Sequence, residues 1–187
     1  MPVVVRCCGR MHDAPSASAQ HVALARAHLT WMGILDDPWA ESMLRPRWAR
    51  VARSLRRPPL TRIGRNPSFA YLAARTRFFD DAVVDALDAG IRQVVVLGAG
   101  YDSRAWRLAR PRVQFFEIDR PATQRDKRAR APGPGPRYVE AALGIDALDQ
   151  VLPAAGFAAG QLAVFTVEGL TMYLPERDAK ELLTTAG

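Results

Sequence analysis

The sequence predicts an α/β fold, with a parallel sheet whose strands alternate with helices and follow a helical N-terminal segment. Short β-branched and aromatic runs, such as QVVVL at residues 93–97 and LAVFTVEGL at residues 162–170, are separated by stretches whose apolar residues recur at helical spacing. A run that is apolar throughout indicates a strand buried on both faces. Such strands are typical of parallel sheets covered by helices on both sides.

Composition narrows the class of protein. The 187 residues are 49% hydrophobic and 24% charged, as in an ordinary globular domain. No apolar run approaches the ~20 residues that span a bilayer, and the apolar start of the chain is too short for a signal-peptide core. We therefore expect a cytoplasmic protein with no membrane partner. The adjacent Cys7 and Cys8 lack the spacing of metal ligands, so we expect no metal site.

The N-terminal part is expected to be helical. Residues 1–17 show no periodicity and are predicted to be disordered. Helical spacing begins at residue 18 and resumes after Asp36-Asp37-Pro38 as far as Leu44. A second long helix is predicted between the N-cap Asn66 and the glycine cap Gly90. We expect one domain over 18–187, helical at 18–90 and α/β at 91–187.

Residues 45–65 concentrate the positive charge of the chain. They contain eight arginines and no acid, whereas the net charge of the whole chain is +7. One interpretation is contact with nucleic acid or another anionic surface. The other is a solvated helix with Trp48, Val51 and Leu55 turned inward. We favour the second, and expect no nucleic-acid partner, because no stacking or groove-reading motif accompanies the charge.

The α/β part is predicted to alternate regularly. The expected order is strand 93–97, helix 103–110, strand 112–119, helix 121–131, strand 137–143, helix 146–152, strand 162–170 and a helix from 175. A sheet order of 3-2-1-4 leaves the apolar fourth strand at an edge, which natural proteins avoid. We therefore expect a sheet truncated after this strand, in a chain that is the front part of a larger domain, or a partner that supplies the missing edge. An oligomer formed through this edge is one such expectation.

The glycines after the first strand indicate a ligand site. Gly98 and Gly100 lie where the first strand ends, and ligands of open parallel sheets bind beyond the carboxyl ends of the strands. Asp119 ends the second strand, 19 residues beyond Gly100, where a carboxylate accepts hydrogen bonds from ribose hydroxyls. Glu117 points to the same face but lies deeper in the strand, so strand geometry favours Asp119.

The residues after these glycines indicate the kind of cofactor. A dinucleotide-binding loop has a third glycine beside the pyrophosphate, and this chain has Ser103 there, preceded by Asp102. An acid repels a pyrophosphate and attracts an ammonium group. The loop therefore favours S-adenosylmethionine, which carries an ammonium and a sulfonium, over NAD or FAD.

Four ordered segments resemble a known family. They are RTRFFDDAV, QVVVLGAGYDSRAWRL, FFEIDRP and VEGLTMYLP, and the leading segment ALARAHLTWMGILDDPWA also matches. In order and spacing they resemble the leucine carboxyl methyltransferase-like family, most closely its bacterial branch of S-adenosylmethionine-dependent methyltransferases. The resemblance runs from residue 16 to the end. It implies a Rossmann-like methyltransferase fold, with further strands and a substrate-covering insertion after the fourth strand.

The resemblance also implies roles for single residues. Arg75 would pair with the cofactor carboxylate, with Arg26 as a second basic position, and Asp119 would hold the ribose. The remaining implied positions are Gly98, Ala99 and Gly100 along the methionine part, Asp102 near its ammonium, Glu168 near the amino group or the reacting centre, Tyr173 beside it, and Leu143 at the adenine. One position departs from the family: Ala142 stands where an acid contacts the adenine amino group. This loss should weaken adenine binding by about 1–3 kcal/mol, unless Asp146 or backbone groups substitute.

The predicted function is methyl transfer by in-line displacement to a carboxylate or hydroxyl oxygen of an unidentified acceptor. A carboxylate acceptor needs no general base, whereas a hydroxyl acceptor would need one, with Glu168 or Tyr173 as the candidates. Two alternatives stay open at this point. One is an NAD(P)-dependent oxidoreductase on a similar sheet, and the other is an inactive truncated domain that binds anions through residues 45–65.

Overall fold

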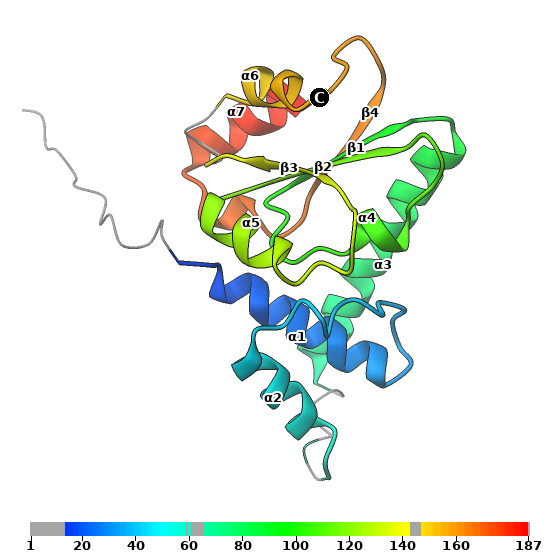
Figure 1. Cartoon of the computed structure of the whole chain (residues 1–187), viewed down its shortest axis with the longest axis vertical. Coiled ribbons are helices and arrows are strands. Elements are labelled where there is room, and N and C mark those ends of the chain that lie inside the picture. Colours follow the sequence, from blue (N-terminus) through cyan, green and yellow to red (C-terminus); the bar gives the residue numbers. More distant parts are fainter. Residues whose placement is uncertain (1–13, 59, 61–65, 143–146, 187) are drawn as a thin grey trace, which may run out of the picture.

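The computed structural model describes residues 14–58, 60, 66–142 and 147–186. A four-stranded parallel sheet carries helices on both faces, and the N-terminal helices lie below it in Figure 1. The elements are α1 (Ala17–Trp31), α2 (Pro46–Leu55), α3 (Pro67–Asp88), β1 (Gln93–Leu97), α4 (Arg104–Arg107), β2 (Gln114–Asp119), α5 (Pro121–Arg128), β3 (Arg137–Glu140), α6 (Leu148–Ala154), β4 (Ala163–Val167), the 3-10 helix η2 (Thr171–Tyr173) and α7 (Glu176–Ala186). None of the described helices has the length and apolar character needed to cross a membrane.

The sheet has the order β3-β2-β1-β4, which confirms the predicted 3-2-1-4 order. Its register pairs Leu97 with Ile118 on one side and with Val167 on the other, so the ends of β1, β2 and β4 are level. Residues that directly follow these strands therefore meet at one edge of the sheet. Among the described strands, β4 pairs only with β1 and forms an edge.

Alternation along the strands gives each face of the sheet its own core. Val95 and Leu97 face the side covered by α6 and α7, which is the upper layer in Figure 1. Val94 and Val96 face α3 and α4 on the other side. Because side chains alternate, Glu117 and Asp119 share this second face with Phe115. The residues that end β1, β2 and β4 thus lie next to the N-terminal helices.

The N-terminal helices begin where the sequence places caps. The Ser16 hydroxyl accepts a hydrogen bond from the backbone N–H of Ala19, and the Asn66 side chain caps α3 through Ser68. Gly90 follows α3 with a left-handed φ of 95°, as expected of a glycine cap. Ser16 already belongs to the start of α1. The predicted disorder of residues 1–17 otherwise falls mostly outside the described residues.

Two predictions about the helical part were wrong. Residues 38–44 form turns and a bend and no helix, and Arg45, which precedes Pro46 at the start of α2, has extended backbone. Ala40, Met43 and Leu44 of this segment are buried all the same, so the helical spacing reflected burial alone. Val51 is 41% exposed, because α2 turns Ala52 and Leu55 towards α1 instead.

The predicted boundaries in the α/β part were too long at several ends. The second strand begins at Gln114 and not at residue 112, because Arg112 has a left-handed φ of 64°. The helix predicted over 103–110 is the single turn Arg104–Arg107, and the strand predicted over 137–143 ends at Glu140. All four strands and their intervening helices nevertheless occur in the predicted order.

Candidate functional site

The loop after β1 requires its glycines. Gly98 and Gly100 have left-handed φ values of 67° and 51°. A Cβ on Gly98 would lie 3.0 Å from the Leu170 side chain, and one on Gly100 would lie 2.8 Å from the Cβ of Ala19. The N–H of Ala99 donates to the carbonyl of Ile118 at 3.0 Å, which ties the loop to β2. The loop thus offers bare backbone at the end of the central strand.

Asp119 lies directly against this loop, as the sequence predicts. One of its oxygens accepts the N–H of Gly100 at 2.6 Å, and the other accepts the N–H of Arg120 at 2.7 Å. Burial raises the pKa of Asp119 above its ordinary value, although these two backbone hydrogen bonds work in the opposite direction. Since a carboxylate has about four acceptor positions, Asp119 can accept further hydrogen bonds from a ligand.

Glu117 is withdrawn from the loop, which agrees with the preference for Asp119. It is fully buried, and its carboxylate forms an ion pair with the equally buried Lys127 of α5. Burial raises the pKa of Glu117 to about 7, against the opposing effect of Lys127. Glu117 therefore anchors α5 to β2 inside the fold.

Asp102 is buried and bound to Arg104. One oxygen of Asp102 accepts the backbone N–H of Arg104 at 2.6 Å, and the other accepts the guanidinium of the same residue. Burial is the largest single influence and would raise the pKa of Asp102, but the nearby cations, Arg104 foremost, together lower it well below its ordinary value. Asp102 is therefore an ionised carboxylate that faces the protein interior. Its predicted contact with an ammonium group stays a prediction.

Arg104 is shared among three carboxylates from three parts of the chain. Besides Asp102, its Nε donates to Asp80 of α3 at 2.7 Å, and a terminal nitrogen donates to Glu168 after β4 at 2.8 Å. The Arg104 side chain is completely buried. Burial would lower the pKa of this guanidinium, but the three carboxylates raise it above its ordinary value. Arg104 thus joins α3, the glycine loop and β4.

Arg75 and Glu168 form the outer part of this cluster. The Nε of Arg75 donates to one oxygen of Glu168 at 2.8 Å, while Arg104 holds the other oxygen. The two side chains are 18% and 12% exposed, so the pair is partly open to solvent. The guanidinium of Arg75 also lies 5.7 Å from the centre of the Tyr71 ring, and Gly169 leaves room beside it. A cation and an anion are thus presented side by side.

Arg26 of α1 is buried beside the end of the glycine loop, at Tyr101. It donates to the backbone carbonyl of Tyr101 at 2.5 Å and forms an ion pair with Asp37 at 3.0 Å. Asp37 also faces Arg107 at 3.8 Å, and Arg107 binds Asp80 at 2.6 Å. The role of Arg26 in carboxylate binding stays a prediction.

These contacts form one alternating set of charges, which we call the loop charge network. It consists of the cations Arg26, Arg75, Arg104 and Arg107 and the anions Asp37, Asp80, Asp102 and Glu168. The four positive charges equal the four negative charges. Since burial penalises an uncompensated charge, this balance is what lets the network persist inside the fold.

Two predicted residues stand apart from the network. Tyr173 lies in η2 and is 63% exposed, and its backbone N–H donates to Leu170. Leu143 lies outside the described residues, as does Asp146, so their predicted places near an adenine stay predictions. Within the described ranges, no cluster of three His, Cys, Asp or Glu side chains could hold a metal ion.

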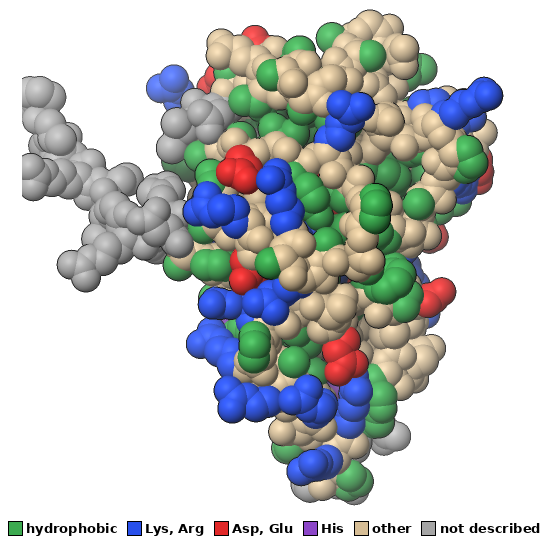
Figure 2. All heavy atoms as spheres, in the orientation of Figure 1, with side chains coloured by type: hydrophobic (Ala, Val, Ile, Leu, Met, Phe, Trp, Pro, Cys, Tyr) green, Lys and Arg blue, Asp and Glu red, His purple; other side chains and the backbone are tan. Residues whose placement is uncertain are grey.

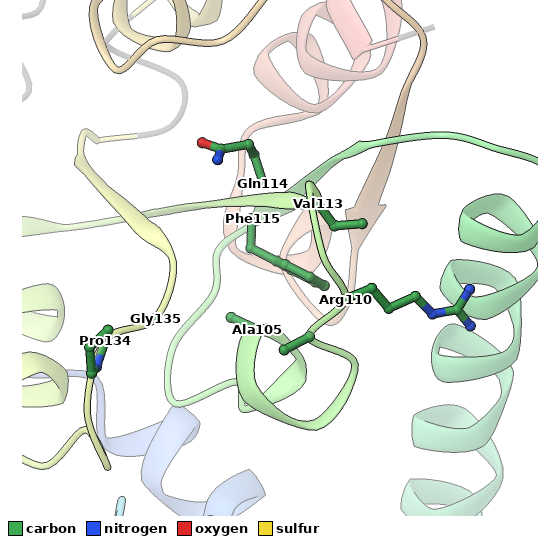
Figure 3. A pocket seen from close by; sticks show the side chains of 8 residues that line it. Ala105, Arg110, Val113, Gln114, Phe115, Pro134 and Gly135 are labelled. Atoms are coloured by element: carbon green, nitrogen blue, oxygen red, sulfur yellow. The ribbon is translucent and has the colours of Figure 1, made fainter.

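Two cavities among the described residues lie away from the glycine loop. One, of about 230 Å³, lies between α4, the start of β2 and the loop at Gly135, with Ala105 and Phe115 in its wall (Figure 3). A second, of about 380 Å³, lies between α6 and β4. Neither contains a predicted site residue. The carboxyl-end site is instead closed by Leu170 over Gly98 and by the ion pair of Arg75 with Glu168.

Sequence reasoning missed four members of the loop charge network: Arg104, Arg107, Asp37 and Asp80. All four stand inside the quoted segments, and Arg104 lies two residues after Asp102 and Asp80 five residues after Arg75. The backbone N–H and the side chain of Arg104 bind the same carboxylate, that of Asp102. An arginine two positions after an acid in a glycine loop was the available signal.

Comparison with known proteins places this chain in a family. A profile of the Leucine carboxyl methyltransferase family matches residues 18–187. A "Putative S-adenosyl-L-methionine-dependent methyltransferase" from Mycobacterium sp. (strain KMS) is 38% identical over 187 aligned positions, which cover 89% of this chain and 60% of that protein. A protein described in the same words from Parafrankia sp. (strain EAN1pec) is 44% identical, over 62% of this chain and 39% of that protein. Another, from Mycolicibacterium gilvum, is 36% identical, over 91% of this chain and 62% of that protein.

Two of these relatives, those from Mycobacterium and Mycolicibacterium, match most of this chain. The chain spans only about 60% of their length. The matched region includes the glycine loop, Asp119, Arg75 and Glu168. The chain belongs to the Leucine carboxyl methyltransferase family.

Proposed function

We propose that the chain binds S-adenosylmethionine and takes part in methyl transfer to a carboxylate or hydroxyl oxygen of a small acceptor. The observation that carries the proposal is the pair of Arg75 and Glu168 beside the bare backbone of Gly98 and Gly100. The names of the relatives support the cofactor, since they are described as dependent on S-adenosyl-L-methionine.

The residues present fit the amino-acid part of this cofactor. Its carboxylate suits the guanidinium of Arg75, and its ammonium suits the carboxylate of Glu168. At present these two side chains satisfy each other at 2.8 Å. Binding of a zwitterion therefore exchanges one ion pair for two, without leaving a buried charge unpaired. Gly98, Ala99 and Gly100 are the proposed surface along the methionine part; in the ligand-free chain Leu170 and Ala19 pack against the two glycines.

The residues also fit the nucleoside part. Asp119 keeps acceptor positions free beyond its two backbone hydrogen bonds, and two neighbouring ribose hydroxyls can occupy them. Ala142 stands where the family has an acid, so we expect weaker recognition of the adenine amino group. Leu143 is proposed to contact the adenine.

When bound, S-adenosylmethionine supplies a methyl group that the adjacent sulfonium has already made electrophilic. The protein's own contribution is to align the acceptor oxygen and to keep water away. A carboxylate acceptor gives up no proton. A hydroxyl acceptor does, and the exposed Tyr173 is the proposed proton acceptor, because the ammonium group and Arg104 occupy the two oxygens of Glu168.

The location and partners of the protein are proposals as well. We propose a cytoplasmic protein that acts on a carboxylate-bearing small molecule, with neither a membrane nor a nucleic-acid partner. The outer side of β4 is the proposed place for association with a second copy, since β4 is an edge of the described sheet and Leu162 before it is 80% exposed. Analytical ultracentrifugation over a range of concentrations tests this; a monomer throughout contradicts it.

Calorimetric titration of the folded chain with S-adenosylmethionine, S-adenosylhomocysteine and NADH tests the proposed function. We expect one binding site for each of the two sulfur compounds and no heat with NADH. Arg75→Met should weaken the binding of both sulfur compounds, because it removes the partner of their carboxylate. Heat with NADH alone would support the oxidoreductase alternative, and absence of heat with either sulfur compound would contradict the proposal.

A further inference from the structure

Neither the resemblance to the family nor the descriptions of the relatives gives Arg104 a function in the site. We propose that Arg104 is the positioning residue of the amino-acid subsite: it holds Asp102 and Glu168 in place while Arg75 exchanges its partner for the ligand. The inference rests on the proposed function, since it concerns how the same site accepts the amino-acid part of S-adenosylmethionine.

The first observation is the geometry of the guanidinium. All three of its nitrogen atoms are used, one for each of Asp80, Asp102 and Glu168. The planar arrangement of these donors fixes the three carboxylates relative to one another. An ammonium group is a point charge and cannot hold three acids in this way, so lysine is not an equivalent residue here.

The second observation is the difference in burial between the two arginines that hold Glu168. The Arg104 side chain is completely buried, whereas that of Arg75 is 18% exposed. Arg104 has two further carboxylates, and the Nε of Arg75 has only Glu168 as an acid partner among the described residues. A ligand that arrives from solvent therefore meets Arg75 and leaves Arg104 in place.

The third observation is the local lock between Arg104 and Asp102. The backbone N–H and the guanidinium of Arg104 bind the two oxygens of Asp102, so the first turn of α4 and the glycine loop form one rigid unit. Glu168 joins this unit through its second oxygen, at 2.8 Å. Its first oxygen then stays directed at the position that Arg75 occupies now, where an ammonium group is to be received.

The test compares two ligands on the same protein. S-adenosylhomocysteine carries the amino-acid part, and 5′-methylthioadenosine is the same thioether nucleoside without it. In Arg104→Gln and Arg104→Lys we expect the affinity for S-adenosylhomocysteine to fall about tenfold or more, since a charged buried hydrogen-bond partner is lost. Affinity for 5′-methylthioadenosine should change less than about threefold. Equal losses for both ligands, or no loss for either, would overturn the proposal.

Arg107→Gln is the matched control. Arg107 is a buried arginine three residues further on, and it binds Asp80 but neither Asp102 nor Glu168. It should lower stability and leave the ratio of the two affinities unchanged. If the ratio of the two affinities also changes in Arg107→Gln, a general loss of stability, and not the contacts of Arg104, determines how strongly the amino-acid part is bound.

A measurement on the unchanged chain covers the case in which the Arg104 variants do not fold. In ¹⁵N-labelled protein, the Nε–H signal of Arg104 should stay protected from solvent exchange when S-adenosylhomocysteine is added, while that of Arg75 shifts. Exchange of the Arg104 signal in the complex would overturn the proposal. If the unchanged chain binds neither ligand, the proposed function fails. In that case, slow solvent exchange of the Arg104 Nε–H in the ligand-free protein still tests separately whether Arg104 is bound to its carboxylate partners.

Discussion

Two sets of arginines in this chain show what burial does to the same side chain. In the loop charge network, Arg26, Arg104 and Arg107 are almost fully buried, and each binds at least one carboxylate. On α2, in contrast, Arg50 and Arg53 are exposed, and no ion pair joins either of them to an acid within the described part of the chain. Figure 2 shows Lys and Arg side chains gathered over the region of α2, in the lower part of the view.

The difference follows from solvation. An arginine in water needs no partner, and surface ion pairs contribute little. A buried arginine without a carboxylate carries a large desolvation penalty, so its position is fixed by its partners. The arginines that specify the site are therefore the buried ones, although the exposed ones dominate the charge pattern of the sequence. The following substitutions test this contrast, from the largest expected effect to the smallest.

Arg104→Gln should cause the largest loss. It leaves Asp80, Asp102 and Glu168 without their shared cation, and breaking a buried ion pair by removing one partner costs about 3–5 kcal/mol. Urea unfolding followed by circular dichroism measures the free energy of unfolding. A loss of less than about 1 kcal/mol would mean that the cluster is open to water in solution.

Gly100→Ala should have the next largest effect, because it disturbs the loop that carries the network. The residue has a left-handed φ of 51°, and a Cβ would lie 2.8 Å from Ala19. We expect a loss of about 1–3 kcal/mol in the free energy of unfolding. Gly33→Ala is the matched control, with a φ of 71° and nothing within 4 Å of its Cβ. Equal losses in the two variants would show that α1 does not press on the loop.

His28 gives the buried region a dependence on pH. It is 1% exposed between Trp31 and Phe69, and neither ring nitrogen has a hydrogen-bond partner within the described residues. Burial, and then the charge of Arg56, lowers its pKa below the ordinary 6.5. The unfolded chain therefore takes up a proton in a range where the folded chain does not. Stability is lost as the pH falls from about 6.5 towards the lower folded pKa.

The difference between the unchanged chain and His28→Leu isolates this effect from other titrating groups. In urea unfolding at pH 8 and pH 5.5, the leucine variant should gain stability relative to the unchanged chain at the lower pH. A difference that is the same at both pH values would show that folding does not lower the pKa of His28.

Arg50→Gln should have the smallest effect, within about 0.5 kcal/mol of the unchanged chain. The side chain is exposed on α2, so its loss leaves no buried charge behind. The same urea experiment measures it beside Arg104→Gln. A clear loss in Arg50→Gln would contradict the contrast between the two sets of arginines.

The order of strands was predictable because β1 and β4 are short apolar runs and because all four strands alternate with helical segments. QVVVL at residues 93–97 was placed without error, and the parallel order then followed from the alternation with helices. Residues 38–44 were misread because burial in turns repeats the spacing of a buried helix. Val51 was misplaced for a related reason, since the helical period does not say which apolar residue faces the neighbouring helix.

The site was predictable as far as its residues follow strands. Gly98, Gly100, Asp119 and Glu168 end three neighbouring strands, and parallel pairing brings such residues to one edge. Asp80 and Arg104 were not predictable in this way. Their contacts depend on how α3 turns against the sheet, which brings residues 24 positions apart to 2.7 Å. The spacing of residues along the chain does not predict how α3 is rotated against the sheet.

A crystal structure of the chain with S-adenosylhomocysteine tests the central claim most directly. We predict the ligand beyond the ends of β1, β2 and β4, with its carboxylate on Arg75, its ammonium on Glu168 and its ribose on Asp119, and with Arg104 still bound to Asp102. A ligand bound elsewhere, such as in the cavity between α4 and β2, with the Arg75–Glu168 pair intact, would contradict it.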